Sequence, residues 1–381
     1  MRVAIAHPWF VETGGAEKVV GALAMAFPGA DIYTLAADPA CVPPVIQQSN
    51  IYTSVLNPLL ASRLRYRRAS FMALFPWAVK TLHLSHYDLI ISSCGPAMMG
   101  VPCDQTAKHI CYFHTPHRAW WDLYATRQSQ LGWLRRQVFT ACASRMRNWE
   151  FNSTQRVDYV ISNSQYISKR VYKYLCREST VIYPPVDTSI GYLTAKSDDY
   201  YLSIARLDTE KRIDLVIRAC NQLKRRLVVV GTGREEAHLK AMAGATISFA
   251  GRVSDDSRSK LYANCRAYVF AGDEDFGIAP VEAQAFGRPV IAYGHGGLLE
   301  TMEYDANGLC TTGVLFLEQT VPSVVEAIVQ FESDEHTFNP LAIQRHARRF
   351  DTSVFIDRMQ QFVECSMQKE SAAYAKHECF T

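Results

Sequence analysis

The amino-acid sequence predicts an α/β protein of two domains, each built around a parallel β-sheet. Short runs that are almost wholly apolar alternate with longer amphipathic segments, as expected for strands that helices cover on both faces. The alternation stops at YPPVD (183–187), where two prolines interrupt regular structure, and then starts again. A chain of 381 residues is also long enough for two hydrophobic cores.

The first domain is predicted over residues 1–186. Its buried strands are four apolar runs at 3–7, 88–93, 109–113 and 159–164. A Gly14-Gly15 turn follows the first strand and leads into a helix over 16–26. That helix is amphipathic, and its apolar side consists of Val19, Val20 and Leu23.

The second domain is predicted over residues 187–351. Its strands are the runs at 200–205, 226–231, 246–251, 267–272 and 289–293. A helix from about 210 to 223 has one apolar stripe, formed by Ile213, Val216, Ile217, Cys220 and Leu223. The remaining segment, 352–381, begins with a helix over about 352–368, for which Asp351 or Thr352 can serve as the N-cap.

Composition restricts the class of protein. Hydrophobic residues make up 48% of the chain and charged residues 20%, which is typical of a soluble globular protein. No run of 18 or more apolar residues predicts a transmembrane helix. The 11 cysteines are scattered, form no CxxC pair and follow no secretion signal. We therefore expect reduced thiols in a cytoplasmic protein and no bound metal.

Charge is distributed unevenly between the two halves. Residues 1–187 contain 19 Lys and Arg against 11 Asp and Glu, whereas the remainder is acidic, for a total of +3. The basic residues are densest at 63–68 and along 127–147. They form either ordinary solvated faces or a surface that contacts an anionic membrane or a phosphorylated acceptor. A net charge of +3 with an acidic second half fits nucleic-acid binding poorly.

Two carboxylates stand out in EDFGIAPVE (274–282). Glu274 is expected on a strand-to-helix loop and Glu282 about one turn into the helix. Ligands of open parallel sheets bind beside the carboxyl ends of strands, and carboxylates accept hydrogen bonds from sugar hydroxyls. The helix-opening amides of Phe276, Gly277 and Ile278 would point toward an anion. The alternative is a capped loop with two solvated acids.

Two cations, Arg206 and Lys211, follow another predicted strand in ARLDTEKR. A guanidinium and an ammonium together suit a diphosphate, although surface charge is the simpler interpretation of either residue alone. Glycines follow three strands, at Gly14-Gly15, at Gly231 and Gly233, and at 294–297, where backbone can approach a ligand closely. None completes the G-x-G-x-x-G fingerprint of dinucleotide binding.

The segment YFHTPHRAWWD (112–122) is unusual in composition. His114 lies just beyond a predicted strand, and we expect it to contact substrate, with a buried structural histidine as the alternative. His114 and His117 lack a carboxylate or thiol at a spacing that would complete a metal site. The neighbouring aromatic side chains are expected to pack in the core or between domains; they are Trp120, Trp121 and Tyr124.

Jointly these motifs resemble the retaining GT-B glycosyltransferases of family 4 over nearly the whole chain. The resemblance is carried by the E-x7-E element with its FG turn, the GG loop, the Arg206 and Lys211 pair, GGLLE (296–300), YPPVD and ARRFDTSVF (347–355). It implies two Rossmann-like domains facing a central cleft, with a C-terminal helix. HTPHRAWWDLY and TTGVLF (311–316) further resemble bacterial mannosyltransferases of polysaccharide assembly, although His117 and Ala119-Trp120 depart from the usual pattern.

The resemblance implies transfer of mannose from GDP-mannose, with retention, to a glycan acceptor on a polyprenyl diphosphate at the inner face of the cell membrane. Arg206 and Lys211 would neutralise the leaving diphosphate, Glu274 would hold the sugar, and His114 would face it. The donor would also be bound by Glu282 at the ribose, by Arg252 and Val253 at the base, and by Gly14, Gly15, Gly233, Phe276, Gly277 and Ile278. No divalent metal or other cofactor is implied.

Four alternatives stay open at this point. The first is the same transfer reaction with a UDP-sugar as the donor in place of GDP-mannose. A sugar-nucleotide epimerase would convert the donor without an acceptor. A nicotinamide-dependent oxidoreductase is disfavoured by the incomplete glycine fingerprint. A transferase-like subunit that only binds would not need the full set of acids and cations.

Overall fold

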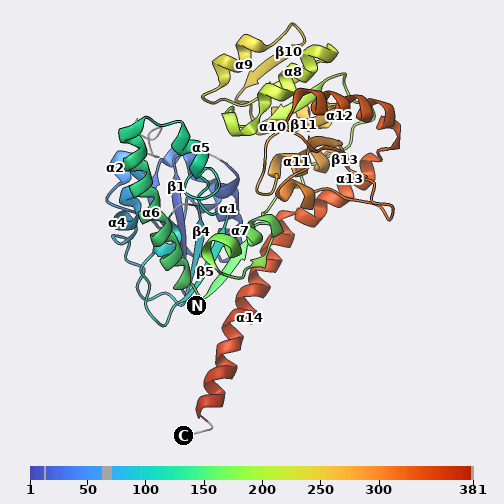
Figure 1. Cartoon of the computed structure of the whole chain (residues 1–381). Helices are drawn as coiled ribbons and strands as arrows, with labels where there is room; N and C mark the ends of the chain where they lie inside the picture. Colours follow the sequence, from blue (N-terminus) through green and yellow to red (C-terminus); the bar gives the residue numbers. More distant parts are fainter. Residues whose placement is uncertain (13, 62–70, 96, 379–381) are drawn as a thin grey trace. The chain divides into compact units, whose positions relative to one another are not determined.

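The computed structural model describes residues 1–12, 14–61, 71–95 and 97–378, with side chains up to residue 368. The chain forms two compact units (Figure 1). Unit 1 comprises Met1–Pro185 and Phe355–Thr381, and unit 2 comprises Val186–Val354. The basic stretch at 63–68 lies outside the described residues.

Unit 1 is built on a seven-stranded parallel sheet of order β3-β2-β1-β4-β5-β6-β7. Its strands are β1 (Val3–Phe10), β2 (Asp31–Ala37), β3 (Ile51–Thr53), β4 (Leu89–Cys94), β5 (Lys108–Phe113), β6 (Tyr159–Ser162) and β7 (Thr180–Val181). All four predicted strands are present. The run predicted to 164 ends at Ser162, because the Ser164 hydroxyl caps the next helix by accepting from the Ile167 amide at 3.1 Å.

Helices cover both faces of this sheet (Figure 1). They are α1 (Gly15–Ala26), α2 (Asn57–Leu60), α4 (Phe75–Val79), α5 (Tyr124–Ser129), α6 (Trp133–Gln155), α7 (Gln165–Leu175) and α14 (Thr352–Glu378). Alternate residues of β1 enter opposite cores: Ala4 and Ala6 enter one, and Val3 and Ile5 the other. Each face of the sheet therefore has its own apolar layer.

The C-terminal helix α14 packs on unit 1. Its Phe355, Met359 and Val363 are buried in the same core as α1, and the Gln360 side chain donates to the Ala26 carbonyl at 2.8 Å. The helix starts where the sequence predicts, with the Asp351 carboxylate accepting from the Ser353 amide at 2.9 Å, but it continues to Glu378 instead of ending near residue 368.

Unit 2 is built on a six-stranded parallel sheet of order β10-β9-β8-β11-β12-β13. The strands are β8 (Tyr201–Ile204), β9 (Leu227–Val230), β10 (Ile247–Gly251), β11 (Ala267–Phe270), β12 (Val290–Tyr293) and β13 (Gly313–Phe316). The helices are α8 (Ile213–Leu223), α9 (Glu236–Met242), α10 (Asp255–Asn264), α11 (Ile278–Ala285), α12 (Val321–Asp334) and α13 (Pro340–Ala347). The predicted fold class, two Rossmann-like parallel-sheet domains, is confirmed.

The predicted start of the first helix in unit 2 is also wrong. The helix expected from about 210 begins only at Ile213. Residues Thr209–Lys211 form a 3-10 turn, and Arg212 then adopts a left-handed conformation with φ 51°. Lys211 therefore lies in the connection ahead of α8 instead of in its first turn.

Each sheet reverses its strand order once. In unit 1 the chain leaves β1 for β2 on one side and later returns to β4 on the other. In unit 2 the corresponding reversal lies between β8 and β11. The loops at the carboxyl ends of such strand pairs diverge and leave a crevice where ligands of doubly wound sheets bind.

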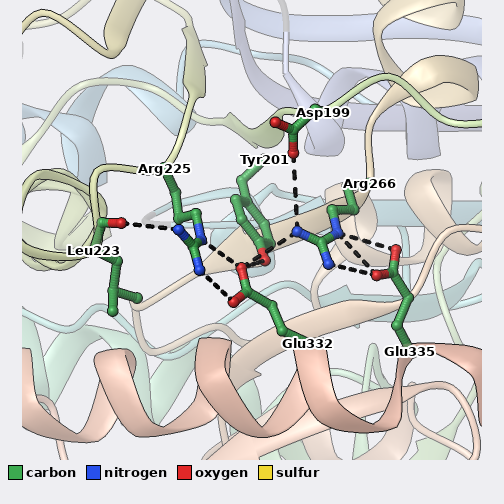
Figure 2. Close-up of polar contacts among 7 residues, drawn as sticks. All are labelled: Asp199, Tyr201, Leu223, Arg225, Arg266, Glu332 and Glu335. Carbon is green, nitrogen blue, oxygen red and sulfur yellow. Dashed lines mark hydrogen bonds and ion pairs between the residues drawn. The ribbon is translucent and has the colours of Figure 1, made fainter.

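The opposite, amino edge of the unit 2 sheet carries an ion-pair cluster (Figure 2). Arg225 donates from Nε and Nη2 to the two oxygens of Glu332, both at 2.7 Å. Arg266 donates from Nη2 to Glu335 at 2.6 Å and from Nη1 to Glu332 at 3.3 Å, and the Tyr201 hydroxyl donates to Glu332 at 2.8 Å. These contacts fasten α12 to the amino ends of β8, β9 and β11.

None of the helices in the described part of the chain is long and apolar enough to cross a membrane.

Candidate functional site

The strand order of unit 2 sets the predicted site residues in a row along the carboxyl edge of its sheet. Following the order β10, β9, β8, β11 and β12, the loops after these strands carry Arg252, Gly233, Arg206, Glu274 and Gly296. Since all the strands are parallel, their carboxyl ends meet at this one edge. Motifs that are far apart in the sequence thus become neighbours in the fold.

Lys211 and Glu274, from the loops that follow β8 and β11, are in direct contact. The Lys211 ammonium donates to Glu274 Oε1 at 2.5 Å. Their side chains are 25% and 23% exposed, so a ligand can reach both. The sequence predicted both residues at the site, but their ion pair was not predicted, because it joins loops 63 positions apart.

Arg206 lies one loop turn away, two residues beyond β8. Its Nε donates to the Asp208 carboxylate, and its side chain is 57% exposed. Asp208 was not predicted as a partner. This contact keeps the Arg206 guanidinium near the carboxyl end of β8.

Glu282 is buried at 9% exposure in the second turn of α11. Its Oε2 accepts a hydrogen bond from the Tyr262 hydroxyl at 2.9 Å. Burial and the adjacent Glu282 carboxylate both raise the pKa of Tyr262 well above its usual range, so Tyr262 acts as a donor at neutral pH. Tyr262 was not predicted, and it fixes the rotamer of the glutamate.

The FG turn before α11 requires its glycine. Gly277 has φ +102°, a left-handed conformation that side chains with a Cβ adopt only with strain. The Phe276 ring is 3% exposed and meets Phe350 edge-on at 5.4 Å. Phe276 and Gly277 can therefore offer a ligand their backbone amides, which lie at the start of the helix with that of Ile278.

Gly233 serves loop packing in the structure. A Cβ at this position would lie 2.3 Å from the Leu207 carbonyl oxygen. The loops after β8 and β9 are joined there by a hydrogen bond from the Leu207 amide to the Thr232 carbonyl at 3.0 Å and by one from the Glu235 amide to Leu207 at 2.9 Å. A larger residue would push these two loops apart.

The loop after β12 is joined to the Glu274 loop. The Gly297 amide donates to the Glu274 carbonyl at 2.9 Å, and His295 Nδ1 lies 2.9 Å from Asp273 Oδ1. Asp273 and His295 were not predicted, although the GGLLE motif lies one residue beyond His295. Asp273 and Asp275 also give this loop an Asp-x-Asp spacing; no group of three or more candidate metal ligands occurs among the described residues.

At the far end of the row, Arg252 and Val253 follow β10. Arg252 is exposed, and Val253 is half-buried against the apolar layer on one face of the unit 2 sheet. The structure places both residues at the carboxyl edge, as predicted from the strand pattern.

In unit 1, His114 directly follows β5 and ends a chain of buried polar side chains. His114 Nε2 lies 2.8 Å from Ser93 Oγ, Ser93 Oγ lies 3.2 Å from His7 Nδ1, and His7 Nε2 lies 3.7 Å from Glu17 Oε1. Burial lowers the pKa of His114 to about 3, with His7 as a lesser cause, so the ring is neutral at physiological pH. His7, Ser93 and Glu17 were not predicted.

The glycine turn lies beside the same chain. Gly14 is the N-cap residue of α1 in an extended conformation, and Gly15 opens the helix. A Cβ on Gly14 would lie 3.1 Å from Glu17 Oε2. The glutamate carboxylate therefore packs directly against the turn.

The aromatic segment after His114 is held by buried charges. Glu150 of α6 accepts from the Trp121 indole at 2.7 Å and from the His117 amide at 3.2 Å, and burial raises its pKa to about 7. Arg170 of α7 donates to Thr115 Oγ1 at 2.6 Å and to Asp122. The tryptophans pack within unit 1.

Two family models match the chain and together span residues 13–349. The model described as Glycosyltransferase Family 4 matches residues 13–190, and the one described as Glycosyl transferases group 1 matches residues 191–349. The boundary between the two matches falls just after the YPPVD segment.

Curated relatives include the alpha-1,3/1,6-mannosyltransferase ALG2 of Mus musculus, 26% identical over 343 residues that cover 78% of this chain and 77% of the mouse protein. The ALG2 of Candida glabrata is 28% identical over 42% of this chain and 47% of its own length. A GDP-mannose-dependent alpha-mannosyltransferase of Corynebacterium glutamicum is 32% identical over 33% of this chain and 30% of that protein.

Solved structures share the fold at low identity. Sucrose-phosphate synthase of Thermosynechococcus elongatus superimposes with a TM-score of 0.71 at 18% identity, over 97% of this chain and 100% of that one. Anabaena HepE, solved in complex with UDP-glucose, gives a TM-score of 0.69 at 17% identity, over 96% and 100%. With both halves matched by glycosyltransferase models, the chain belongs to the GT-B glycosyltransferases of family 4.

Proposed function

We propose that this glycosyltransferase moves mannose from GDP-mannose, with retention, onto a glycan acceptor carried by a polyprenyl diphosphate in exopolysaccharide or O-antigen assembly. The observation that carries the donor site is the Lys211–Glu274 pair at the strand reversal of unit 2. The choice of sugar and nucleotide is supported by relatives that are named mannosyltransferases, one of them GDP-mannose-dependent.

In this proposal Lys211 and Arg206 stabilise the leaving diphosphate. The bond between the sugar C1 and the phosphate oxygen breaks, and negative charge develops on that oxygen. An ammonium has three donors; one is used on Glu274, which leaves two for phosphate oxygens. Arg206, more than half exposed, adds a second positive charge at the same strand end.

Glu274 holds the transferred sugar and is not the general base. Its Oε1 accepts from the Lys211 ammonium, and the carboxylate oxygens can also accept hydrogen bonds from sugar hydroxyls. The acceptor hydroxyl attacks C1, and its proton passes to the departing phosphate oxygen on the same face of the sugar. No protein base is needed in that step, and no divalent metal is included in it.

The rest of the donor is assigned along the same row. Glu282, oriented by Tyr262, accepts from the ribose hydroxyls. The amides of residues 276–278 bind sugar and phosphate at the start of α11, while Arg252 and Val253 contact the base. Gly233 allows the neighbouring loop to approach the phosphates. In unit 1, Gly14 and Gly15 are assigned to the donor and His114 to the transferred sugar.

The acceptor is assigned to unit 1, together with an anionic membrane surface at the cytoplasmic face of the cell membrane. The first turns of α6 expose Trp133, Leu134 and Val138 at 75%, 68% and 59%, next to Arg135 and Arg136. A hollow of about 380 Å³ lies between α6 and residues 72–73. Exposed tryptophan and leucine interleaved with arginine suit a peripheral contact with anionic lipid.

Donor identity is tested with a thermal-shift panel of GDP-mannose, GDP-fucose, UDP-glucose and UDP-N-acetylglucosamine, followed by transfer to a lipid-linked acceptor. Binding raises the melting temperature in proportion to ln(1 + [L]/Kd), so GDP-mannose should give the largest shift. If only the UDP-sugars raised the melting temperature, the donor nucleotide would be UDP and not GDP. Conversion of donor without acceptor would indicate an epimerase, and binding without turnover a non-catalytic subunit.

The membrane assignment predicts that the protein sediments with phosphatidylcholine vesicles containing phosphatidylglycerol and much less with phosphatidylcholine alone. Trp133→Ala combined with Leu134→Ala should weaken sedimentation at least tenfold, because two apolar anchors are lost. Tyr172→Ala, which removes an exposed aromatic ring of α7, is the matched control. Equal sedimentation of all three proteins would contradict the assignment.

A further inference from the structure

The FG turn at the start of α11 packs against the residues that follow α13. The Phe276 ring meets Phe350 edge-on at 5.4 Å, and Phe350 meets His346 edge-on at 5.7 Å. All three residues belong to unit 2, and each is 3% exposed. Phe276 therefore buries its side chain in the protein, while its backbone lies at the carboxyl edge of the sheet, just after β11.

Phe350 is held in place by its own backbone, independently of the FG turn. Its carbonyl accepts from the Val186 amide at 2.9 Å, and the Thr352 amide donates to the Val186 carbonyl at 3.1 Å. These bonds pair residues 350–352 with the buried first residue of unit 2. The Phe350 ring is thus a fixed surface on which the Phe276 ring packs.

His346, on the other side of Phe350, is also held. Its Nε2 donates to the Thr301 carbonyl at 3.0 Å, because a carbonyl oxygen can only accept. At the end of α11, the Gln344 side chain donates to the Ala285 carbonyl at 2.9 Å. The residues of α13 and those that follow it therefore contact α11 and its leading turn at both ends of the helix.

The opposite side of the FG turn is closely packed as well. A Cβ on Gly297 would lie 2.0 Å from the Asp275 carbonyl oxygen, and a Cβ on Gly277 would lie 3.0 Å from Leu298 Cδ1. The loop after β12 thus packs directly on the turn, which lies between this loop and the Phe350 ring. Confinement from two sides favours one direction for the backbone amides of the turn, as preorganised hydrogen-bond donors require.

We propose that Phe350 is a positioning residue of the donor site: its ring anchors Phe276 and so holds the amides of residues 276–278 in the direction that the phosphate and sugar of the donor require. The assignment of those amides to the donor rests on the proposed function. A smaller side chain at position 350 leaves the Phe276 ring without its edge contact, and the turn then adopts other conformations. Apparent affinity falls with the fraction of molecules that keep the competent turn.

The turn itself is measured without any ligand, by amide hydrogen exchange and mass spectrometry. The Val281 amide donates to the Gly277 carbonyl at 3.3 Å and closes the first turn of α11. In Phe350→Leu, peptides covering residues 276–283 should exchange about threefold faster than in wild type, because this turn opens more often. Phe276→Leu removes the same contact from the other side and should show the same increase. Exchange at the wild-type rate in both variants would overturn the proposal.

Phe331 supplies a matched control. Its fully buried ring stacks on Phe338 at 5.7 Å and belongs to the apolar layer that contains Tyr201. Phe331→Leu therefore removes a ring of the same size from another part of unit 2. Exchange of residues 276–283 should stay within about twofold of wild type in this control. An increase equal to that of Phe350→Leu would show a general loss of stability and contradict the positioning role.

Calorimetry with GDP-mannose tests the consequence for the donor. Phe350→Leu should raise the Kd about tenfold, equivalent to about 1.4 kcal/mol, and Phe331→Leu less than about twofold. In a double-mutant cycle, Phe276→Leu with Phe350→Leu should bind within about twofold of Phe350→Leu alone, because either substitution removes the same ring contact. Losses that multiply in the double variant would overturn the proposal.

Failure of the proposed function gives a different result. A wild type that binds neither GDP-mannose nor GDP would contradict the donor assignment, while hydrogen exchange in Phe350→Leu and Phe331→Leu would still decide whether Phe350 holds the turn. Normal donor affinity in Phe350→Leu together with faster exchange would leave the donor site intact and overturn the positioning role.

Discussion

The two edges of the unit 2 sheet use the same chemistry, a cation beside a carboxylate, in different ways. At the amino edge Arg225 is engaged by both oxygens of Glu332, and that carboxylate accepts two more hydrogen bonds (Figure 2). At the carboxyl edge Lys211 and Glu274 share one contact between loops shaped by glycines. At the amino edge the charged groups bind one another through several hydrogen bonds, whereas the single contact at the carboxyl edge leaves donors and acceptors that a ligand can use.

The surroundings of an ion pair, and not the pair itself, therefore indicate whether it stabilises the fold or binds a ligand. The guanidinium of Arg225 is the main cause that holds the pKa of Glu332 below its usual range, as expected for a structural pair. The carboxyl-edge pair lies at a strand reversal, where the fold places ligands. Loss of an amino-edge residue should therefore reduce stability, and loss of a carboxyl-edge residue should reduce transfer.

The largest expected effect is that of Lys211→Ala. Transfer should fall about 10²–10³-fold, because charge on the leaving diphosphate loses a positioned cation. The melting temperature should change by less than about 3 °C, because the side chain is a quarter exposed. Lys240→Ala, which removes an exposed lysine paired with Glu236, is the charge-matched control and should keep full activity. Near-normal turnover of Lys211→Ala would remove it from the donor site.

Glu274→Ala should lower kcat/KM about 10²-fold while GDP affinity stays within about threefold of wild type. The carboxylate is assigned to the sugar, which GDP lacks, and its removal leaves Lys211 available to phosphate. Turnover assays and calorimetry with GDP measure the two quantities. A large loss of GDP affinity would move Glu274 from the sugar to the nucleotide.

Glu332→Ala should act on stability. The substitution leaves Arg225 without its bidentate partner and removes acceptors from Arg266 and Tyr201, so the free energy of unfolding should fall by about 1–3 kcal/mol. Urea denaturation measures it. Turnover of the folded protein should stay within about twofold of wild type, and a hundredfold loss would contradict the division between the two edges.

The smallest effect is a change in acid sensitivity. Because the folded-state pKa of Glu332 is lowered, its contribution to stability is present above the unfolded-state pKa of about 4.5 and is lost as pH falls through the folded-state value. Glu332→Gln, which cannot ionise, should therefore show a shallower loss of stability below about pH 4.5. If the free energy of unfolding fell equally below pH 4.5 in wild type and variant, this carboxylate would add nothing to acid sensitivity.

Sequence patterns predicted most of the fold and part of the candidate site, because each predicted motif directly follows a strand that is apolar enough to recognise. Glu274 and Lys211 were found in this way. Their mutual contact was not, since it depends on β8 and β11 being neighbours in the sheet. The pairing of Arg225 with Glu332, 107 positions apart, was not predicted for the same reason.

Buried polar residues within strands were harder to interpret. His7 ends the run VAIAH, and in the sequence it marks only where the apolar run stops. Its neighbours are Ser93 and Glu17, which come from a distant strand and from the following helix. Periodicity locates such a residue on a strand but does not show which side chains face it.

The most direct test of the central claim, that the carboxyl edge of the unit 2 sheet binds the donor, is the dissociation constant of GDP measured by calorimetry in wild type, Arg206→Ala and Arg225→Ala. Removing a charge-assisted contact with phosphate should weaken GDP binding at least tenfold in Arg206→Ala. Arg225→Ala, at the opposite edge, should bind GDP as wild type does. Unchanged affinity in Arg206→Ala together with a loss in Arg225→Ala would contradict the account.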